Sequence, residues 1–181
     1  MHLLSRLLVV LVICLVAIAL PAVPAEADSE GPSIRLSHSH GIPGTPVTVY
    51  GYNFTAEERV YVSYDGNDED YVETDDEGDF QATFEVPESC TGYHTVLAED
   101  REGKYAFTEF EVEPGLTVNL EEGPVGTTVT VEGHGFADEE EEIELRYYLD
   151  GDAYETIAEN IEADKDGWWE VSFEIPDSAK G

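Results

Sequence analysis

Apolar and polar residues alternate along most of the chain beyond residue 30. The pattern is clearest over residues 80–86 and again over residues 169–175. A period of two puts every second side chain on the same face, which is typical of a strand with one buried and one solvated side. The side chains expected to point into a core are Phe80, Ala82, Phe84 and Val86 in the first run, and Trp169, Val171, Phe173 and Ile175 in the second.

Shorter segments carry the same alternation at 47–49, 60–64, 94–98 and 106–112. His94 takes an inward position in one of them, and we interpret it as a core histidine. No stretch after residue 27 shows the 3.6-residue period of an amphipathic helix. Short strands divided by turns predict an all-β protein built as a β-sandwich.

One phrase occurs twice, as GIPGTPVTVYGYNF at 41–54 and as GPVGTTVTVEGHGF at 123–136, at a spacing of 82 (123 − 41). Residues 74–92 also match residues 163–181, at a spacing of 89 (163 − 74). A repeat of this length is a whole domain rather than a solenoid unit. We therefore predict two modules, over 32–113 and 115–181, joined directly at Pro114-Gly115.

The second copy has less sequence than the first. Gly181 aligns with Gly92, so the strand-forming residues 93–113 have no counterpart in the second copy. We expect the second module to be incomplete, with its last two strands missing and a strand edge left unpaired. We interpret the sequence as a fragment of a longer reading frame; a donor strand from another chain is the alternative.

The N-terminus reads as a secretion signal. Arg6 precedes an apolar run from Leu7 to Leu20, and small residues with an Ala-x-Ala pattern follow at 25–27. That run is short for a membrane span and suits a signal peptide. We assign 1–27 as the signal peptide and 28–31 as a short leader, with a retained N-terminal anchor as the alternative. We expect the protein to be secreted or at the cell surface. Cys90 is then the single cysteine of the mature chain, which favours a small buried hydrophobe over an interchain disulfide.

The charge is extreme: 41 acidic residues against 8 basic ones give a net charge of −33. Nucleic acid and anionic lipid surfaces need Lys and Arg to neutralise their phosphates, so both are poor partners, and we expect no nucleic acid to bind. Apart from the signal segment we expect no membrane insertion. Such acidity is typical either of a surface solvated in a salty medium or of one that gathers divalent cations.

The repeated phrase, followed by DGWWEVSFEIPDSAKG at 166–181, resembles the IPT/TIG-type immunoglobulin-like repeats of prokaryotic surface proteins. The segment GYHTVLAEDREGKYAFTEFEV at 92–112 is similar to the closing strands of such repeats. This resemblance implies early-set immunoglobulin-like sandwiches in tandem on an extracellular protein. It implies no catalytic residues.

Two acidic stretches, DGNDED at 65–70 and DDEGD at 75–79, are dense enough in carboxylates to consider Ca²⁺, which prefers six to eight oxygen ligands. Neither has the spacing of a calcium loop, and Lys165 replaces Asp76 in the second copy, so solvated turns are the favoured interpretation. We expect no other cofactor. The candidate calcium ligands are Asp65, Asp68, Asp70, Asp75, Asp76 and Asp79.

The sequence contains no nucleophile elbow, phosphate loop or Cys-x-x-Cys pair, and we expect no enzymatic activity. His38 and His40 could share one strand face, but no third metal ligand accompanies them. Asn53-Phe54-Thr55 is a glycosylation sequon. Because Gly135 replaces Asn53 in the second copy, a left-handed turn position also explains this residue.

The strand phase predicts an unusual outer face on the first module. If the alternating valines and phenylalanines point inward, several large apolar residues on neighbouring strands must point outward. Together they would form a patch able to dock another domain or a ligand, with tyrosines as amphipathic anchors. The residues of this predicted patch are Tyr61, Tyr93, Leu97, Tyr105 and Phe107.

These observations favour a non-catalytic, exported structural or adhesive module of a cell-surface protein. Its expected partners are neighbouring repeats, other cell-surface proteins or glycans. The alternative is a carbohydrate-binding accessory module of an extracellular enzyme, with Trp168 as the platform on which a sugar ring stacks.

The charge generates a first prediction. Repulsion among the carboxylates should destabilise the fold at low ionic strength, and added NaCl should raise the melting temperature by screening it. Ca²⁺ should raise it beyond matched ionic strength only if a calcium site exists. Thermal unfolding monitored by circular dichroism in graded NaCl and CaCl₂ measures both effects, and a flat response to both salts contradicts the prediction.

Overall fold

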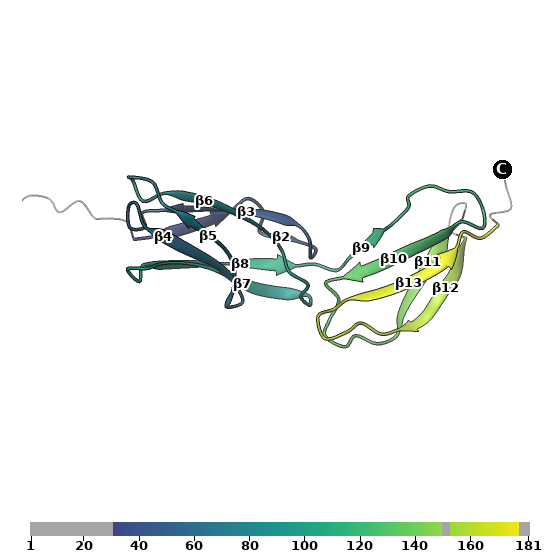
Figure 1. The fold of residues 1–181 in the computed structure, drawn as a ribbon. Coiled ribbons are helices and arrows are strands. Elements are labelled where there is room, and N and C mark those ends of the chain that lie inside the picture. Colours follow the sequence, from purple (N-terminus) through teal and green to yellow (C-terminus); the bar gives the residue numbers. More distant parts are fainter. Residues whose placement is uncertain (1–30, 150–152, 178–181) are drawn as a thin grey trace, which may run out of the picture.

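We describe residues 31–149 and 153–177 of a computed structural model of the chain. The predicted signal peptide 1–27 and most of the 28–31 leader lie outside these residues. Every regular element in the described ranges is a strand, and these ranges contain no helix long and apolar enough to cross a membrane. Figure 1 shows two β-modules placed end to end.

The first module is formed by eight strands in two sheets. One sheet has the order β1-β3-β6 and the other β2-β8-β7-β4-β5. All pairs are antiparallel except β2 with β8, which are parallel. The strands are β1 (Ser33–Leu36), β2 (His40–Gly41), β3 (Pro46–Tyr52), β4 (Arg59–Tyr64), β5 (Asn67–Glu73), β6 (Phe80–Glu85), β7 (Gly92–Asp100) and β8 (Tyr105–Val112).

A single core fills the space between these two sheets. Val47 and Val49 of β3 are fully buried, as are Val60 and Val62 of β4, so side chains from both sheets contribute. The inward phase predicted for residues 80–86 is confirmed, because those four apolar side chains are all buried. Burial of alternating residues from two facing sheets is what defines a β-sandwich.

The sheet order is that of an immunoglobulin-like domain. In that fold the second and fifth strands share one sheet, and the third, sixth and seventh share the other. With β2 taken as the part of the first strand that switches sheets, β3 and β6 lie together on one side, and β4, β7 and β8 on the other. The predicted all-β, immunoglobulin-like sandwich is confirmed.

The second module repeats part of this arrangement. Its sheets have the orders β9-β10-β13 and β11-β12, and its core cluster includes Val129, Val131, Leu145 and Trp169. Within the described residues it has no strands equivalent to β7 and β8. The strands are β9 (Gly115–Val118), β10 (Thr128–His134), β11 (Ile143–Tyr148), β12 (Tyr154–Ile161) and β13 (Trp169–Glu174).

Both modules place a large aromatic side chain directly over a glycine on the neighbouring strand. Gly51 is the cross-strand partner of Phe80, and Gly133 is the partner of Trp169. A Cβ atom on Gly51 would lie 1.9 Å from Phe80 Cε1, and one on Gly133 would lie 2.1 Å from Trp169 Nε1. The glycines of the repeated phrase therefore make room for the core aromatics.

The junction between the modules is short and closely packed. β8 ends at Val112 and β9 begins at Gly115. The amide of Thr91 donates to the carbonyl oxygen of Phe136 at 3.0 Å. A Cβ atom on Gly115 would lie 2.3 Å from Ile42 Cγ2, so the first residue of β9 packs directly against the residue that follows β2.

The glycine beneath Phe80 yields a prediction about stability. Gly51→Ala should lower the free energy of unfolding by about 1–3 kcal/mol, the usual cost of overpacking a core, because the ring must move away from the new methyl group. Gly31→Ala is the control, since nothing lies within 4 Å of a Cβ there. Urea unfolding of the two variants and the parent measures the difference, and equal stability of both variants would show that Phe80 repacks freely.

Candidate interaction surface

The outer face of the β5-β4-β7-β8 sheet carries the predicted aromatic patch. Tyr93 is 69% exposed, Phe107 65% and Tyr105 60%. Tyr61 and Leu97 lie on the same face but are half-buried. The structure thus places all five predicted residues on one sheet face, three of them largely free.

Strand register arranges these side chains in rows across the sheet. Tyr61 pairs with Tyr71 on one side and with Glu99 on the other, and Glu99 pairs in turn with Tyr105. The adjacent row pairs Leu97 with Phe107. Paired residues on one face have Cβ atoms about 5 Å apart, so each row is a continuous contact surface.

Tyr71 extends this surface beyond the predicted residues. It is 59% exposed, and its ring centroid lies 6.4 Å from that of Tyr61. The DGNDED stretch that carries the preceding residues was expected to be a solvated turn, and this is wrong for residues 67–70, which belong to β5. The hairpin signal was present in Asp65-Gly66, whose φ values of 48° and 82° suit a tight two-residue turn.

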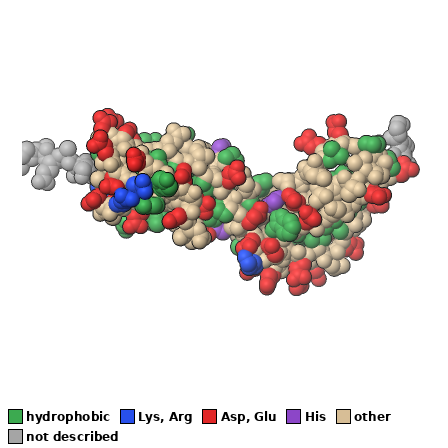
Figure 2. Space-filling view, viewed as in Figure 1, with side chains coloured by type: hydrophobic (Ala, Val, Ile, Leu, Met, Phe, Trp, Pro, Cys, Tyr) green, Lys and Arg blue, Asp and Glu red, His purple; other side chains and the backbone are tan. Residues whose placement is uncertain are grey.

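Two arginines lie against the tyrosines. The guanidinium carbon of Arg59 lies 4.6 Å from the ring centroid of Tyr71, a cation–π contact. Hydrogen bonding by Arg101, and after it by Arg59, lowers the pKa of the Tyr61 hydroxyl. Few basic residues are available in a chain with 8 Lys and Arg, and Figure 2 shows red acidic side chains spread over both modules with blue ones in a few places.

This combination of side chains is suited to recognition. Tyrosine and arginine are enriched at the centres of protein interfaces, because each adds a large contact area and directed hydrogen bonds. The Arg59 guanidinium covers one face of Tyr71, while Tyr93, Tyr105 and Phe107 are free to be covered by a partner. We call the surface formed by Tyr61, Tyr71, Tyr93, Leu97, Tyr105 and Phe107 the tyrosine face.

The candidate calcium ligands do not converge. No group of three or more His, Cys, Asp or Glu in residues 31–149 and 153–177 has the geometry of a metal site. Asp75 accepts hydrogen bonds from the amides of Glu77 and Asp79, both at 2.9 Å, and so closes its own turn. Asp79 accepts from the amide of Asn53 at 3.3 Å.

The remaining candidate ligands are spread along the adjoining hairpin. Asp70 accepts from the amide of Tyr71 at 2.7 Å. Asp68 lies exposed on β5, and Asp76 is exposed in the 75–79 turn. Asp75 therefore stabilises its own turn, as the turn interpretation expected of the 75–79 stretch, whereas Asp70 lies on β5.

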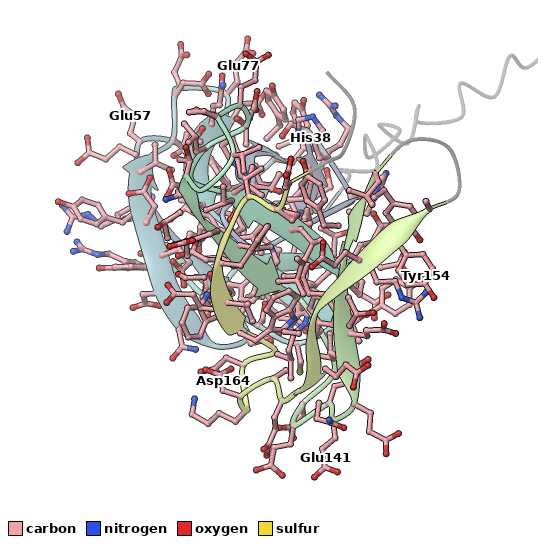
Figure 3. The ribbon with its side chains drawn as sticks, turned by 90° about the vertical axis from the view of Figure 1, so that its right-hand side faces the viewer. His38, Glu57, Glu77, Glu141, Tyr154 and Asp164 are labelled. Carbon is pink, nitrogen blue, oxygen red and sulfur yellow. The ribbon has the colours of Figure 1, made fainter. Side chains whose placement is uncertain are left out.

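The Asp75 turn is one of three with the same design. Asp100 and Asp164 also accept bonds from the amides two and four residues later, and a glycine with positive φ follows each aspartate at the third position. Figure 3 shows Glu77 and Asp164 at loops on the periphery of the molecule. Three aspartates, Asp75, Asp100 and Asp164, thus serve to close turns.

Asp100 is the most strongly held of these carboxylates. It is 3% exposed, and its second carboxylate oxygen accepts from the amide of Thr55 at 3.0 Å. Burial alone would raise the pKa of Asp100, but the hydrogen bonds from Thr55, Lys104 and Glu102 outweigh it and lower the pKa below its ordinary value. Asp100 therefore ties the β7–β8 turn to the loop before β4.

His94 links the β4–β5 turn to β7. Its Nδ1 lies 2.7 Å from the carboxylate of Asp65, and its Nε2 lies 2.8 Å from the backbone carbonyl of Cys90. The ring also stacks on Tyr64 at 5.2 Å, and burial raises the pKa of that tyrosine to about 12. The side chain of His94 is 11% exposed, which agrees with the expected structural role. The imidazole contacts the carbonyl of Cys90, and that half-buried residue is a free thiol.

Two other predicted sites lie away from the tyrosine face. Asn53 is exposed with φ 62°, and Gly135 at the equivalent position has φ 68°, so the predicted left-handed turn is confirmed. Trp168 is half-buried in the Asp164 turn, beside a shallow hollow that Ile161 and Glu170 also line.

No protein-family model matches the chain, and no curated protein matches it. Among solved structures, the human OSCAR ligand-binding domain is similar at 13% identity over 84% of this chain and 86% of that chain, with a TM-score of 0.34. Trypsin-activated alpha-2-macroglobulin from Escherichia coli is similar at 17% identity over 81% of this chain, with a TM-score of 0.36. The chain spans only 13% of that second protein. The assignment to the immunoglobulin-like class follows from the sheet order and the core of the chain itself.

Asp100 allows a test with a worked-out pH dependence. Asp100→Asn places an amide group opposite the Thr55 N–H and removes the charge from three hydrogen bonds, so it should cost about 1.5–3 kcal/mol of unfolding free energy at pH 7. Because the pKa is lowered on folding, the ionised carboxylate stabilises the fold above its unfolded pKa of about 3.9. That advantage is lost as the pH falls through the folded pKa.

Denaturant unfolding of the parent and Asp100→Asn at pH 7 and at pH 3 measures this change. The difference between the two proteins should shrink at pH 3, while the exposed Asp76→Asn control should remain close to the parent at both values. An equal loss at both pH values would assign the role of Asp100 to its shape rather than to its charge.

Proposed function

We propose that this protein is a non-catalytic, exported immunoglobulin-like module that serves a structural or adhesive role at the cell surface. The tyrosine face of the first module is its contact surface. The observation that carries the proposal is the coincidence of three aromatic side chains, each at least 60% exposed, on a single sheet face of a strongly acidic protein.

Exposure of these aromatic side chains to water is unfavourable, and a bound partner would remove that exposure. Covering Tyr93, Tyr105 and Phe107 favours binding, because each Å² of apolar area removed from water stabilises the complex by about 25 cal/mol. The surrounding sheet is antiparallel and fully paired across β4, β7 and β8, so the aromatic side chains are held on a rigid base. Little ordering is therefore required when a partner binds.

The partner is best described by its chemistry. Arg59 and Arg101 lie at one end of the tyrosine face and present the positive charge that the rest of the surface lacks. A protein domain with an apolar centre and a carboxylate positioned near these arginines would complement it. Another module of the same kind has many acidic loops, and these supply carboxylates that can lie near the arginines.

The resemblance to IPT/TIG-type repeats and the predicted signal peptide support the same function. The carbohydrate-binding alternative depends on Trp168, but sugar stacking needs a broad free ring face. Trp168 is half-buried in its turn, whereas Tyr93, Tyr105 and Phe107 of the tyrosine face are largely exposed. We therefore favour a protein partner.

The proposal predicts that Tyr93→Ser combined with Phe107→Ser reduces attachment several-fold without unfolding the protein. Beads coated with purified protein and applied to cells of the source organism, and to beads of the same kind, measure the attachment. Tyr148→Ser is the matched control, because Tyr148 is 61% exposed in the second module and away from the tyrosine face.

Melting curves of each variant separate loss of contact from loss of fold. Undiminished attachment of the folded double variant would overturn the role of the tyrosine face. Binding of the parent to immobilised glycans that is abolished by Trp168→Ala would favour the carbohydrate-binding alternative instead.

A further inference from the structure

The second module has an apolar groove where the first has two strands. The groove has a volume of about 480 Å³ and is lined chiefly by Val118, Val131, Leu145, Ile157 and Phe173. These side chains come from both sheets, so the groove opens directly onto the core of the module.

The first module shows what occupies the equivalent position. There, β7 and β8 lie between β4 and β2, and they bury Val96, Ala98, Phe110 and Val112 with at most 1% exposure. By the repeat, β11 corresponds to β4, and residues 122–123 correspond to β2 at 40–41. Tyr147 of β11 and Glu122 both line the groove, so it lies between the same two edges.

Backbone groups at both edges are available to pair. In the first module the amides of Glu111 and Glu113 on and after β8 donate to the carbonyls of Ser39 and Gly41 at 2.9 and 3.0 Å. The corresponding carbonyls, those of Glu121 and Gly123, accept no backbone hydrogen bond from the described residues. On the opposite side, β11 pairs with β12 alone in the described ranges.

The apolar residues around the groove are more exposed than the equivalent residues of the first module. Val118 is 46% exposed and Leu116 is 54% exposed, whereas the equivalent Leu36 and Ile34 pack against the first core. Phe173 is half-buried, while its counterpart Phe84 is 6% exposed. Among the described residues nothing covers the groove over about two strand widths, since neighbouring strands lie about 4.8 Å apart.

We propose that this groove binds an antiparallel β-hairpin, which pairs with the free edge of β11 and with the backbone at 121–123. The inward residues of the hairpin are β-branched or aromatic at alternate positions, as in β7 and β8. Its outward residues are neutral or basic, because Glu121 and Glu122 border the groove and Arg146 is already paired with Glu144. This is recognition by strand addition, in which main-chain hydrogen bonds supply affinity and the groove selects side chains.

The chain itself supplies a probe for this site. A synthetic peptide of residues 92–112 carries both strands with the required alternation, and it contains no tryptophan. The two tryptophans of the protein, Trp168 and Trp169, are both in the second module, and Trp169 belongs to its core. Tryptophan fluorescence of the mixture therefore reports on the second module alone.

Titration of the full chain with this peptide should give a saturable change in tryptophan fluorescence and should raise the melting temperature of the second module. Replacing both Glu109 and Glu111 of the peptide with Lys should tighten binding several-fold by charge complementarity. A peptide with Phe110→Asp should not bind, because the substitution places a carboxylate in the apolar groove.

Two matched valine variants of the protein locate the binding site. Val118→Glu lies in the groove and should weaken binding by about tenfold or more, a change of about 1.4 kcal/mol or more. Val125→Glu should bind normally, since Val125 is 57% exposed and does not line the groove. Both positions are exposed enough for the variants to fold, and circular dichroism checks this.

Absence of a saturable response at millimolar peptide, or binding that Val118→Glu leaves unchanged, would overturn the proposal. If the protein alone forms a dimer that Val118→Glu dissociates, the occupant is a second copy and the hairpin assignment is wrong. The peptide carries Tyr93, Leu97, Tyr105 and Phe107, but Val118→Glu leaves the tyrosine face of the protein intact. Its effect on binding therefore tests the groove and leaves the proposed function to its own test.

Discussion

The whole structure depends on covering the apolar face of each sheet with another sheet. A strand with period two has one face that water disfavours, and a lone sheet cannot hide it. In the first module a three-stranded and a five-stranded sheet cover each other, and eight large side chains fall below 2% exposure. In the second module the described facing sheet has two strands, and no large side chain reaches that level of burial. The same repeated sequence thus yields two degrees of burial, which differ by the presence of β7 and β8.

The alternation of residues is what made the fold predictable. Residues 80–86 and 169–175 were assigned the correct faces because burial requires the period that the sequence displays. The strand β5 was missed because Asn67–Asp70 are polar on both faces and only Tyr71 and Val72 break the acidic run. The tight turn at Asp65-Gly66 brings β5 alongside β4, where the two strands pair. The acidic composition of the segment conceals this local turn signal.

The site could be predicted only in part, for a related reason. Strand phase was enough to bring Tyr93, Tyr105 and Phe107 to one face. The positions of Arg59 and Arg101 against the tyrosines depend on pairing between strands and on side-chain packing, and neither can be read from spacing. The carboxylates showed the opposite difficulty: their number suggested a cation site, while their positions in the Asp75, Asp100 and Asp164 turns serve the backbone.

The parallel pairing of β2 with β8 has a mechanical consequence. β2 lies near the start of the first module and β8 at its end, and the second module follows β8 directly. Tension along the chain pulls β2 and β8 in opposite directions along their common axis. The bonds from Glu111 and Glu113 to Ser39 and Gly41 are then loaded together in shear, rather than opened one after another. A module built in this way resists stretching with both of these hydrogen bonds at once, as the proposed adhesive role would require.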